Sequence, residues 1–388
     1  MRLLIATDHS YLRHNSEVFD VYCFDRSFFD DYRKVFGVVE VICRMKNVDS
    51  LPAGARRSDG DGVRFIGVPD IHGMAWLLRA GWLCGPVLKS AIKRVDAVVA
   101  RVPSQLGWLA AKWARQAGKP YMIEVIGDPI QAIIGVSAKP HYRLIAWLEA
   151  RRLRYLARYA DVASYVGKYL QQAYPPSIGK PYDVVSSIRV DISEITQPRT
   201  FEMVRSKIMI MLVASLVPIK RHRDLIQALR LVVDQGINAE LHLAGDGPCR
   251  KDLEELTRKL RLNDRVVFHG HIADRKALMC LLDASDLFVM TSASEGFPRA
   301  LLEAMARGLP VAGTRAGGLE ELVRGSELFP VGDVRALATL IMNLARDPER
   351  LTEMSRYSVE MASQYTSKIL SPRRVRLYRI LRNQAIRS

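Results

Sequence analysis

Residues 291–321 read TSASEGFPRALLEAMARGLPVAGTRAGGLEE, the most informative run in the chain. Most of Pro298 to Arg307 predicts a helix, because proline suits the first helical turn and Ala, Leu, Met, Glu and Arg are strong helix formers. Gly308 ends this helix, and Leu309 to Ala312 predicts a short buried strand. The run therefore has the alternation of helix and strand that is typical of an α/β protein.

Two glutamates flank the start of this predicted helix. Glu295 lies on the loop before the helix and Glu303 lies on the helix itself. Between them the helix start presents unpaired N–H groups and the positive end of the helix dipole, which together attract phosphate. An acid, a phosphate cradle and a second acid suit a sugar that is joined to a nucleotide through a diphosphate.

Composition limits the class of protein. The chain has 388 residues, enough for two domains, and its 49% hydrophobic and 25% charged residues are ordinary for a soluble globular protein. The net charge of +16 implies an acidic partner, which nucleic acid, anionic lipid or phosphorylated ligands would each provide. The five cysteines lack CxxC or zinc spacing and are interpreted as reduced, mostly buried thiols of a cytosolic protein. They are Cys23, Cys43, Cys84, Cys249 and Cys280.

Two apolar segments bear on insertion into a membrane. Met1 to Asp8 is too short for a signal peptide, and a charged residue comes too early in it. It is therefore interpreted as a first buried strand. The run from Met74 to Leu88 is too short to span a bilayer, and an arginine, two glycines and a proline interrupt it.

Strand-like runs alternate with helical patterns along the whole chain, which predicts parallel α/β architecture. The predicted strands are Leu3–Thr7, Val38–Cys43, Val63–Val68, Ala97–Ala100, Tyr121–Ile126, Val162–Val166, Val184–Ser187, Ile208–Ala214, Ala239–Ala244, Val266–His269, Leu287–Met290, Pro310–Gly313 and Leu328–Pro330. We expect a first domain over 1–190, a polar linker over 191–205, a second domain over 206–365 and a basic helix over 366–388 that packs back on the first domain. Ligand is expected at the carboxyl ends of the strands, in a cleft between the domains.

Several short motifs of the second half resemble, in the same order, those of one known family. They are Val213-Ala-Ser-Leu-Val-Pro-Ile-Lys220-Arg221, Leu241-His-Leu-Ala-Gly245-Asp246-Gly247-Pro248, Val266-Val-Phe-His-Gly270-His271-Ile272, the Glu295 and Glu303 of an E-x7-E signature, and Ala316-Gly317-Gly318-Leu-Glu320. Over Ile208 to Val323 the chain resembles the donor domain of the retaining glycosyltransferases of family 4. The resemblance implies the GT-B fold, an α/β fold with two Rossmann-like domains whose parallel sheets face across a cleft.

The resemblance also implies roles for single residues. Glu303 would bind the ribose hydroxyls and Glu295 the donor sugar hydroxyls, since a carboxylate accepts bidentate hydrogen bonds from a vicinal diol. Lys220 would neutralise the diphosphate leaving group, so Lys220 and Glu295 are candidate catalytic residues. The candidate donor-binding residues are Ser215, Lys220, Gly245, Gly247, Gly270, His271, Ile272, Glu295, Gly296, Phe297, Pro298, Arg299 and Glu303.

These residues also have plain structural explanations. Arg299 is four positions from both glutamates and could form helical ion pairs with them. Lys220 could be a solvated surface lysine, and the turn at Gly245 could serve only the shape of the backbone.

The chain departs from the family at several positions. Ser215 stands where the family has a phosphate-binding arginine, so either Arg221, His222 or Arg299 substitutes or the phosphate is held less tightly. In the first half, Asp8 to Tyr11 occupies a loop where many members have a pair of glycines.

A further departure concerns the strand that contains Met122. Many members have a histidine at its end, where this chain has Gly127-Asp128-Pro129. Asp128 is a candidate catalytic residue near the reacting carbon, or else a turn-forming aspartate before proline. His9, Arg101 and Ser104 follow or end predicted strands and are candidate acceptor contacts.

Two stretches, Lys139 to Tyr159 and Lys368 to Arg387, are rich in arginine, and the first interleaves tyrosine and tryptophan. The Met74 to Leu88 run adds two tryptophans beside further basic residues. These stretches are either solvated helix faces or a surface for anionic lipid, where each basic residue contributes about 1 kcal/mol. The lipid interpretation is favoured, and nucleic acid is not expected because the recognised binding modules are absent from the sequence.

Together these observations predict a retaining glycosyltransferase that uses a UDP- or GDP-linked sugar, needs no metal or other cofactor, and acts on a lipid-linked saccharide. It would lie in the cytoplasm, peripheral to the inner face of the cell membrane, and serve the synthesis of a surface polysaccharide or glycoconjugate. Three alternatives stay open: a soluble small-molecule acceptor, a catalytically degenerate protein that only binds a nucleotide sugar, and a nucleic-acid-binding protein.

Overall fold

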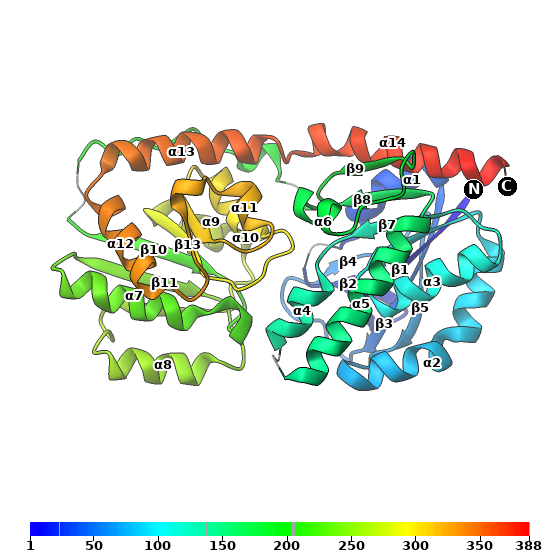
Figure 1. Cartoon of the computed structure of the whole chain (residues 1–388), viewed down its shortest axis with the longest axis horizontal. Helices are drawn as coiled ribbons and strands as arrows, with labels where there is room; N and C mark the ends of the chain where they lie inside the picture. The colour runs from blue at the N-terminus through cyan, green and yellow to red at the C-terminus, as the bar shows by residue number, and fades with distance from the viewer. Residues whose placement is uncertain (23, 137–138, 189, 204–205, 388) are drawn as a thin grey trace. The chain divides into compact units, whose positions relative to one another are not determined.

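Two α/β units make up the chain, and each has its own sheet with helices packed against it (Figure 1). The computed structural model describes residues 1–22, 24–136, 139–188, 190–203 and 206–387. The first unit contains Met1–Ile130, Lys139–Ser187 and Leu370–Ser388, and the second contains Gln131–Ala138 and Ile188–Ile369.

The first unit is built on a sheet that has nine strands among the described residues. They are β1 (Arg2–His14), β2 (Glu17–Asp20), β3 (Val38–Asn47), β4 (Arg56–Arg57), β5 (Val63–Pro69), β6 (Ala97–Val102), β7 (Tyr121–Val125), β8 (Val162–Tyr165) and β9 (Tyr182–Val184). The parallel strands run in the order β5-β3-β1-β6-β7-β8-β9, and β2 and β4 add an antiparallel edge. Strand β6 reads AVVARV and is buried at every position, which is typical of parallel strands covered on both faces.

Strand β1 is longer than the sequence predicts. Its pairing with β3 shifts register between Ala6 and Ser10, and such an irregularity bends a strand without ending it. The far half of β1 then pairs with β2 in antiparallel fashion, at Leu12 to His14. Asp8 to Tyr11, predicted as a loop after the first strand, is therefore part of the strand.

Among the described residues, five α-helices lie wholly within the first unit, together with the short η1 (Arg26–Phe29). They are α1 (Asp30–Phe36), α2 (Gly73–Arg94), α3 (Gln105–Gln116), α5 (Pro140–Tyr159) and α6 (Lys168–Ala173). Two more, α4 (Pro129–Val136) and α14 (Ser367–Arg387), cross the boundary between the units in sequence. Helix α2 contains the apolar run that begins at Met74. None of the helices that the structure describes combines the length and the apolar character needed to cross a membrane.

The second unit has a parallel sheet of six strands among the described residues. They are β10 (Ile208–Val213), β11 (Ala239–Ala244), β12 (Val266–Gly270), β13 (Leu287–Met290), β14 (Val311–Thr314) and β15 (Leu328–Phe329). Their order in the sheet is β12-β11-β10-β13-β14-β15, so the direction of winding reverses between β10 and β13. In open α/β sheets the ligand binds at the carboxyl ends of the strands beside such a reversal.

The helices of the second unit follow the predicted alternation. They are η2 (Ile192–Glu194), η3 (Pro218–Lys220), α7 (His222–Asp234), α8 (Arg250–Lys259), α9 (Arg275–Ala284), α10 (Arg299–Ala306), α11 (Leu319–Leu322), η4 (Gly325–Glu327), α12 (Val334–Ala345) and α13 (Pro348–Ser363). Helix α10 is the one predicted from residues 298–307, with Pro298 as its N-cap. Gly308 follows it with a φ of 64°, the left-handed backbone that ends many helices.

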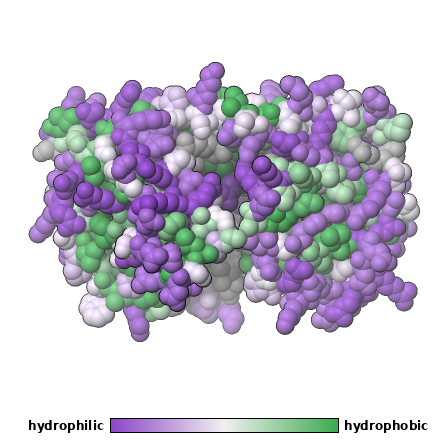
Figure 2. All heavy atoms as spheres, turned by 180° about the vertical axis from the view of Figure 1, so that it is seen from behind, coloured by the Kyte–Doolittle hydropathy of each residue, from purple (hydrophilic) through white to green (hydrophobic). Residues whose placement is uncertain are grey.

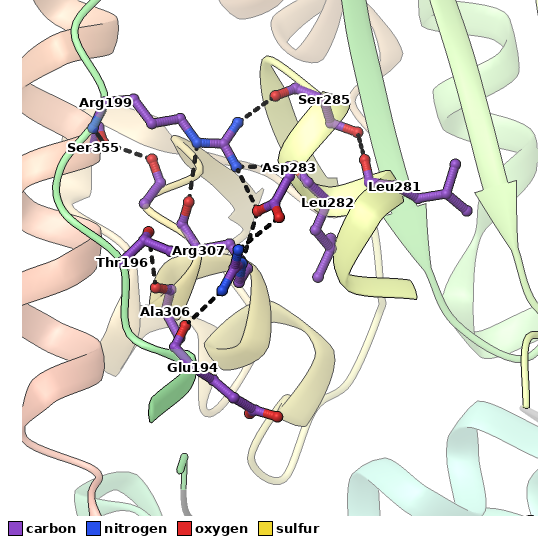
Figure 3. Close-up of polar contacts among 11 residues, drawn as sticks. Glu194, Thr196, Arg199, Leu281, Leu282, Asp283, Ser285, Ala306, Arg307 and Ser355 are labelled. Carbon is purple, nitrogen blue, oxygen red and sulfur yellow. Dashed lines mark hydrogen bonds and ion pairs between the residues drawn. The ribbon is translucent and has the colours of Figure 1, made fainter. Parts of the chain in front are cut away.

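The segment predicted as a linker, 191–205, differs from that prediction. Its described part belongs to the second unit, where Arg199 fastens it (Figure 3). The Arg199 guanidinium donates to the carbonyl oxygens of Ser285 at 2.6 Å, Leu282 at 2.9 Å and Arg307 at 2.9 Å. Because these carbonyls end α9 and α10, one side chain caps two helices, and the polar composition of the segment serves packing rather than flexibility.

The basic helix α14 is held by acids of the first unit. The Nε of Arg373 donates to Asp183 at 3.1 Å, and Arg374 lies 3.2 Å from Asp31. Tyr378 on the same helix is buried and donates to Glu124 at 3.0 Å. Arg373 and Arg374 therefore have structural partners within the first unit. On the face of the molecule in Figure 2, hydrophilic side chains predominate and smaller apolar areas lie between them.

The prediction of mostly buried thiols is correct for two of the described cysteines. Cys43 and Cys84 are buried, and burial raises the pKa of Cys84 to about 11. Cys249 is partly exposed and Cys280 is exposed, while Cys23 lies outside the described residues.

Candidate active site

Lys220 and Glu295 meet where the winding of the second sheet reverses. Lys220 ends η3, which follows β10, and Glu295 lies on the loop after β13. The Lys220 Nζ donates to Glu295 Oε1 at 2.6 Å, although 75 positions separate the two residues in sequence. The side chain of Glu295 is 9% exposed and that of Lys220 is 24% exposed, so the pair is largely withdrawn from water.

The two loops that carry this pair are tied to each other. The hydroxyl of Thr291 donates to the carbonyl of Lys220 at 2.8 Å, and the Ala293 amide donates to the carbonyl of Ile219 at 2.8 Å. The hydroxyl of Thr314, on the next strand, donates to the carbonyl of Ser292. Because buried backbone groups hold both loops, the cation and the carboxylate keep their relative position.

The start of α10 lies directly after Glu295. Pro298 is its N-cap and has no side-chain oxygen, so the first-turn amides get no cap from it and are suited to an anion. Phe297 is buried against Tyr365, with ring centroids 5.0 Å apart. Gly318 packs closely against the backbone of this loop, and a Cβ there would lie 2.3 Å from the carbonyl oxygen of Gly296.

The glycines at 245 and 247 are required by close backbone approach. A Cβ on Gly245 would lie 2.0 Å from the carbonyl oxygen of Ala214, and one on Gly247 would lie 2.6 Å from that of Leu216. The Gly245 amide also donates to the carbonyl of Gly270 at 2.7 Å. The turn thus packs against the loop that leads to Lys220, which supports the structural explanation left open by the sequence.

Comparison with known proteins identifies the family. A profile described as "Glycosyl transferases group 1" matches residues 195–361. The chain is 30% identical over 347 residues to protein CapJ of Staphylococcus aureus, covering 88% of this chain and 85% of CapJ. The chain belongs to the group 1 glycosyltransferases.

Two further proteins place this glycosyltransferase among its relatives. It is 30% identical over 298 residues to 2-deoxystreptamine N-acetyl-D-glucosaminyltransferase of Streptomyces fradiae, covering 71% of this chain and 68% of that protein. Anabaena HepE, solved in complex with UDP and glucose, matches with a TM-score of 0.68 at 20% identity, over 96% of this chain and 98% of HepE. The likeness to HepE shows the GT-B fold, as the sequence predicts.

The glycosyltransferase has Ser215 exposed at the position of the missing arginine. Of the three expected substitutes, Arg221 already donates to Asp224 at 2.6 Å and 3.2 Å. His222 is buried, and burial together with the charge of Lys220 lowers its pKa to about 4, so the ring is neutral near pH 7. Arg299 is the first residue of α10, the helix start at which a phosphate is expected.

Glu303 is held by a residue that sequence reasoning missed. Arg275 donates from Nη1 to Glu303 Oε1 at 3.0 Å, and the side chain of Glu303 is 12% exposed. Arg275 follows the N-cap Asp274 and so puts a cation at the positive end of α9. Since the helix dipole disfavours a cation there, an arginine at such a position is a signal for a nearby acid.

His271 and Ile272 follow Gly270 at the end of β12, on the same edge of the sheet as Lys220. The side chain of His271 is exposed and that of Ile272 is half-buried. No group of three His, Cys, Asp or Glu side chains that could hold a metal is found in the described part of the chain.

The candidates of the first unit have structural partners. Asp128 accepts from the Tyr174 hydroxyl at 2.6 Å and from the Ile130 amide at 2.9 Å, which is the geometry of a turn-forming aspartate. Asp8, where the family has glycines, accepts from the Gln105 amide at 2.8 Å and from the Trp76 indole at 2.7 Å.

The residues predicted to contact the acceptor have partners within the first unit. Arg101 is 4% exposed and its guanidinium lies 5.0 Å and 4.9 Å from two phenylalanine rings, so the structure buries it in the first unit. Ser104 caps α3 by accepting from the Gly107 amide at 2.9 Å. His9 lies 2.6 Å from Asp20. The Ser104 hydroxyl thus caps a helix and the His9 imidazole pairs with Asp20, so both groups have partners within the first unit.

Proposed function

We propose that this glycosyltransferase moves a sugar from a UDP- or GDP-linked donor to a hydroxyl of a lipid-linked saccharide. The transfer retains the anomeric configuration and serves the synthesis of a surface polysaccharide or glycoconjugate. The observation that carries the proposal is the 2.6 Å contact of Lys220 with Glu295 beside the start of α10. This arrangement offers a cation, helix amides and a carboxylate to a diphosphate sugar at one edge of one sheet.

Lys220 acts on the leaving group in this proposal. An ammonium has three N–H donors, so Lys220 can hold Glu295 and a phosphate oxygen at the same time. As the bond from the anomeric carbon to the diphosphate breaks, negative charge grows on the phosphate and the cation stabilises it. The departing phosphate oxygen then accepts the proton of the attacking hydroxyl on the same face of the sugar, which accounts for retention.

The other charges of the site complete the donor contacts. Glu295 accepts from hydroxyls of the donor sugar, Glu303 accepts from the ribose, and the first-turn amides of α10 receive the distal phosphate. Lys220 and the helix end supply the positive charge that a divalent ion would otherwise bring, so we expect transfer to proceed without metal. The complex of the fold relative HepE with UDP and glucose supports a donor of this class.

The surface of α2 and α5 supports a lipid-linked acceptor. Leu78 and Trp82 on α2 are 77% and 80% exposed, and Trp147 on α5 is 49% exposed. A groove of about 390 Å³ is lined by Leu78 of α2 and by Leu148 and Arg151 of α5, among others. The Arg151 guanidinium also lies 5.6 Å from the Trp147 ring. Exposed tryptophan beside arginine is the composition that binds the headgroup level of an anionic bilayer.

A soluble small-molecule acceptor is the second candidate. It is favoured by the name of the Streptomyces fradiae relative, which specifies 2-deoxystreptamine. With such an acceptor, activity would not depend on lipid.

Donor binding is tested by thermal unfolding of the full chain with a panel of UDP- and GDP-sugars. We expect the nucleotides of one base to stabilise it, by about 2.7 kcal/mol at a hundredfold excess over Kd. Glu303→Ala and Lys220→Ala should lose most of this stabilisation. Arg223→Ala, which removes an exposed cation from α7, serves as the matched control and should keep it. Absence of a shift with every nucleotide would contradict the proposal.

Membrane attachment is tested by pelleting with vesicles of neutral lipid alone and with added anionic lipid. We expect binding only to the anionic vesicles, with release at high salt, because the surface charge is screened. Trp82→Ala combined with Trp147→Ala should weaken pelleting, whereas Val331→Ala, an exposed apolar residue of the second unit, should not. If the wild-type chain does not pellet with anionic vesicles, the lipid-linked acceptor is refuted and the soluble one is favoured.

A further inference from the structure

Arg275 bridges two acids that come from different parts of the second unit. Its Nε and Nη2 donate to the two carboxylate oxygens of Glu194 on η2, and its Nη1 donates to Glu303 Oε1 at 3.0 Å. The side chains of Glu194 and Glu303 are 21% and 12% exposed. The Arg275 guanidinium therefore lies between the carboxylate of Glu194 and that of Glu303, the residue that we assign to the ribose.

The position of Arg275 is explained by these acids and not by its helix. It is the first residue of α9, where the helix dipole repels a cation. The hydrogen bonds that the guanidinium donates to Glu194, together with the charge of Glu303, raise its pKa above the ordinary value. Two carboxylates thus offset an unfavourable location, which is the pattern of a residue kept for a specific contact.

Glu194 is itself fixed in place. Its carbonyl oxygen accepts from Arg307 Nη1 at 3.1 Å, and Arg307 is held by Asp283 at 2.6 Å and 2.7 Å (Figure 3). Two residues further on, the Thr196 amide donates to the carbonyl of Ala306 at 2.9 Å. Because the backbone around Glu194 is anchored to α10, its carboxylate is a rigid support for Arg275.

We propose that Arg275 is a positioning residue that orients Glu303 to accept hydrogen bonds from both ribose hydroxyls of the donor nucleotide. The inference rests on the proposed function, in which Glu303 binds the ribose. Arg275 contacts one lone-pair site of the carboxylate, and an ionised carboxylate has about four such sites, so enough remain for a vicinal diol. Through Glu303, Arg275 sets the selectivity for a ribonucleotide over its deoxy counterpart.

The fork geometry of arginine is what this role needs. A guanidinium presents donors in one plane, and here two of them engage Glu194 while a third engages Glu303. A lysine keeps the charge but cannot make this bidentate contact with a third hydrogen bond in a fixed direction. Arg275→Lys is therefore expected to restore only part of the selectivity lost in Arg275→Ala.

The test is the ratio of two affinities, measured by titration calorimetry on the full chain. The probes are UDP or GDP, whichever stabilises the wild-type chain, and its 2′-deoxy and 3′-deoxy counterparts. We expect the wild-type chain to prefer the ribonucleotide about 10- to 100-fold, as loss of a hydrogen bond to a charged group implies. Arg275→Ala should lower this ratio at least about threefold, mainly by lowering the affinity for the ribonucleotide. Glu194→Gln should lower the ratio less.

The control variants separate positioning from a general effect on charge or folding. Lys276→Ala removes the next cation on α9, which is exposed, and should leave the ratio unchanged. In the double variant Glu303→Gln, Arg275→Ala, the ratio should equal that of Glu303→Gln alone, because Arg275 acts through Glu303. Thermal unfolding without ligand shows whether each variant is folded, and Arg275→Lys supplies a second test if Arg275→Ala is not.

The outcomes distinguish the inference from the function on which it rests. If the wild-type chain binds neither nucleotide, the proposed function fails. A second outcome is that Glu303→Gln lowers the ratio, whereas Arg275→Ala and Arg275→Lys weaken the binding of ribonucleotide and deoxynucleotide equally. Arg275 then contributes only charge or stability, and the inference is overturned. A loss of selectivity in both Glu303 and Arg275 variants, without additivity, supports it.

Discussion

Replacement of Lys220 by alanine is expected to lower kcat for sugar transfer about 100- to 1,000-fold, the usual effect of removing one donor to a developing negative charge. The reason is that Lys220 is placed against Glu295 at the strand reversal, where the diphosphate of the donor would lie. The measurement is release of nucleoside diphosphate from the sugar nucleotide that stabilises the chain, with a lipid extract as the acceptor. Lys220→Arg keeps the charge and should lose less.

The folded state of this variant needs its own measurement. Glu295 is 9% exposed, and without Lys220 it loses a hydrogen-bond donor, which we expect to cost about 1–3 kcal/mol of stability. The cost stays within this range because Lys220 is 24% exposed, so water can replace part of the contact. Arg223→Ala is the matched control and should change neither activity nor stability. If folded Lys220→Ala keeps more than half of the wild-type kcat, Lys220 has no role in leaving-group departure.

Replacement of Gly245 by alanine is expected to destabilise the second unit by about 3 kcal/mol or more. The added Cβ would lie 2.0 Å from the carbonyl oxygen of Ala214, and the φ of 143° at this position strains any other residue. The atom that the added Cβ meets is a backbone atom, so a side-chain rotation cannot relieve the clash. Urea unfolding followed by circular dichroism measures the loss.

The control for this prediction is another glycine of the same unit. Gly325 begins η4, and an added Cβ there has no heavy atom of another residue within 4 Å. Gly325→Ala should therefore change stability by less than about 0.5 kcal/mol. Equal stability of the two alanine variants would mean that the Ala214 loop can yield, and that Gly245 is kept for a direct contact with the donor.

The local parts of the fold follow from local chemistry. The strands Ala239–Ala244 and Leu287–Met290 have the predicted bounds, and α10 begins within one residue of its prediction. Continuous apolar runs and strong helix formers carry enough information for such elements. Strand β4 does not follow from local sequence, because it is a pair of exposed arginines and its pairing partner is distant in sequence.

Long-range contacts explain where the structure departs from the sequence expectations. The segment containing Arg199 is polar and lacks periodicity, yet its guanidinium is satisfied by carbonyls more than 80 positions away. The sequence predicts Arg101 just after a strand, but it lies within β6 and is buried beside two aromatic rings. Polarity alone does not distinguish a residue that faces solvent from one that caps a helix or fills a buried network.

From the amino-acid order alone come the alternation of strand and helix, the motif series that places the chain among the group 1 glycosyltransferases, and the two glutamates around α10. These are properties of neighbouring residues, so they can be recognised before folding. The ion pairs of the site do not follow from neighbouring residues in this way. Lys220 and Glu295 are 75 positions apart, and Arg275 and Glu303 are 28 positions apart. Those pairs exist because parallel strands bring their carboxyl ends to one edge of the sheet, and only the tertiary structure decides which side chains face each other there.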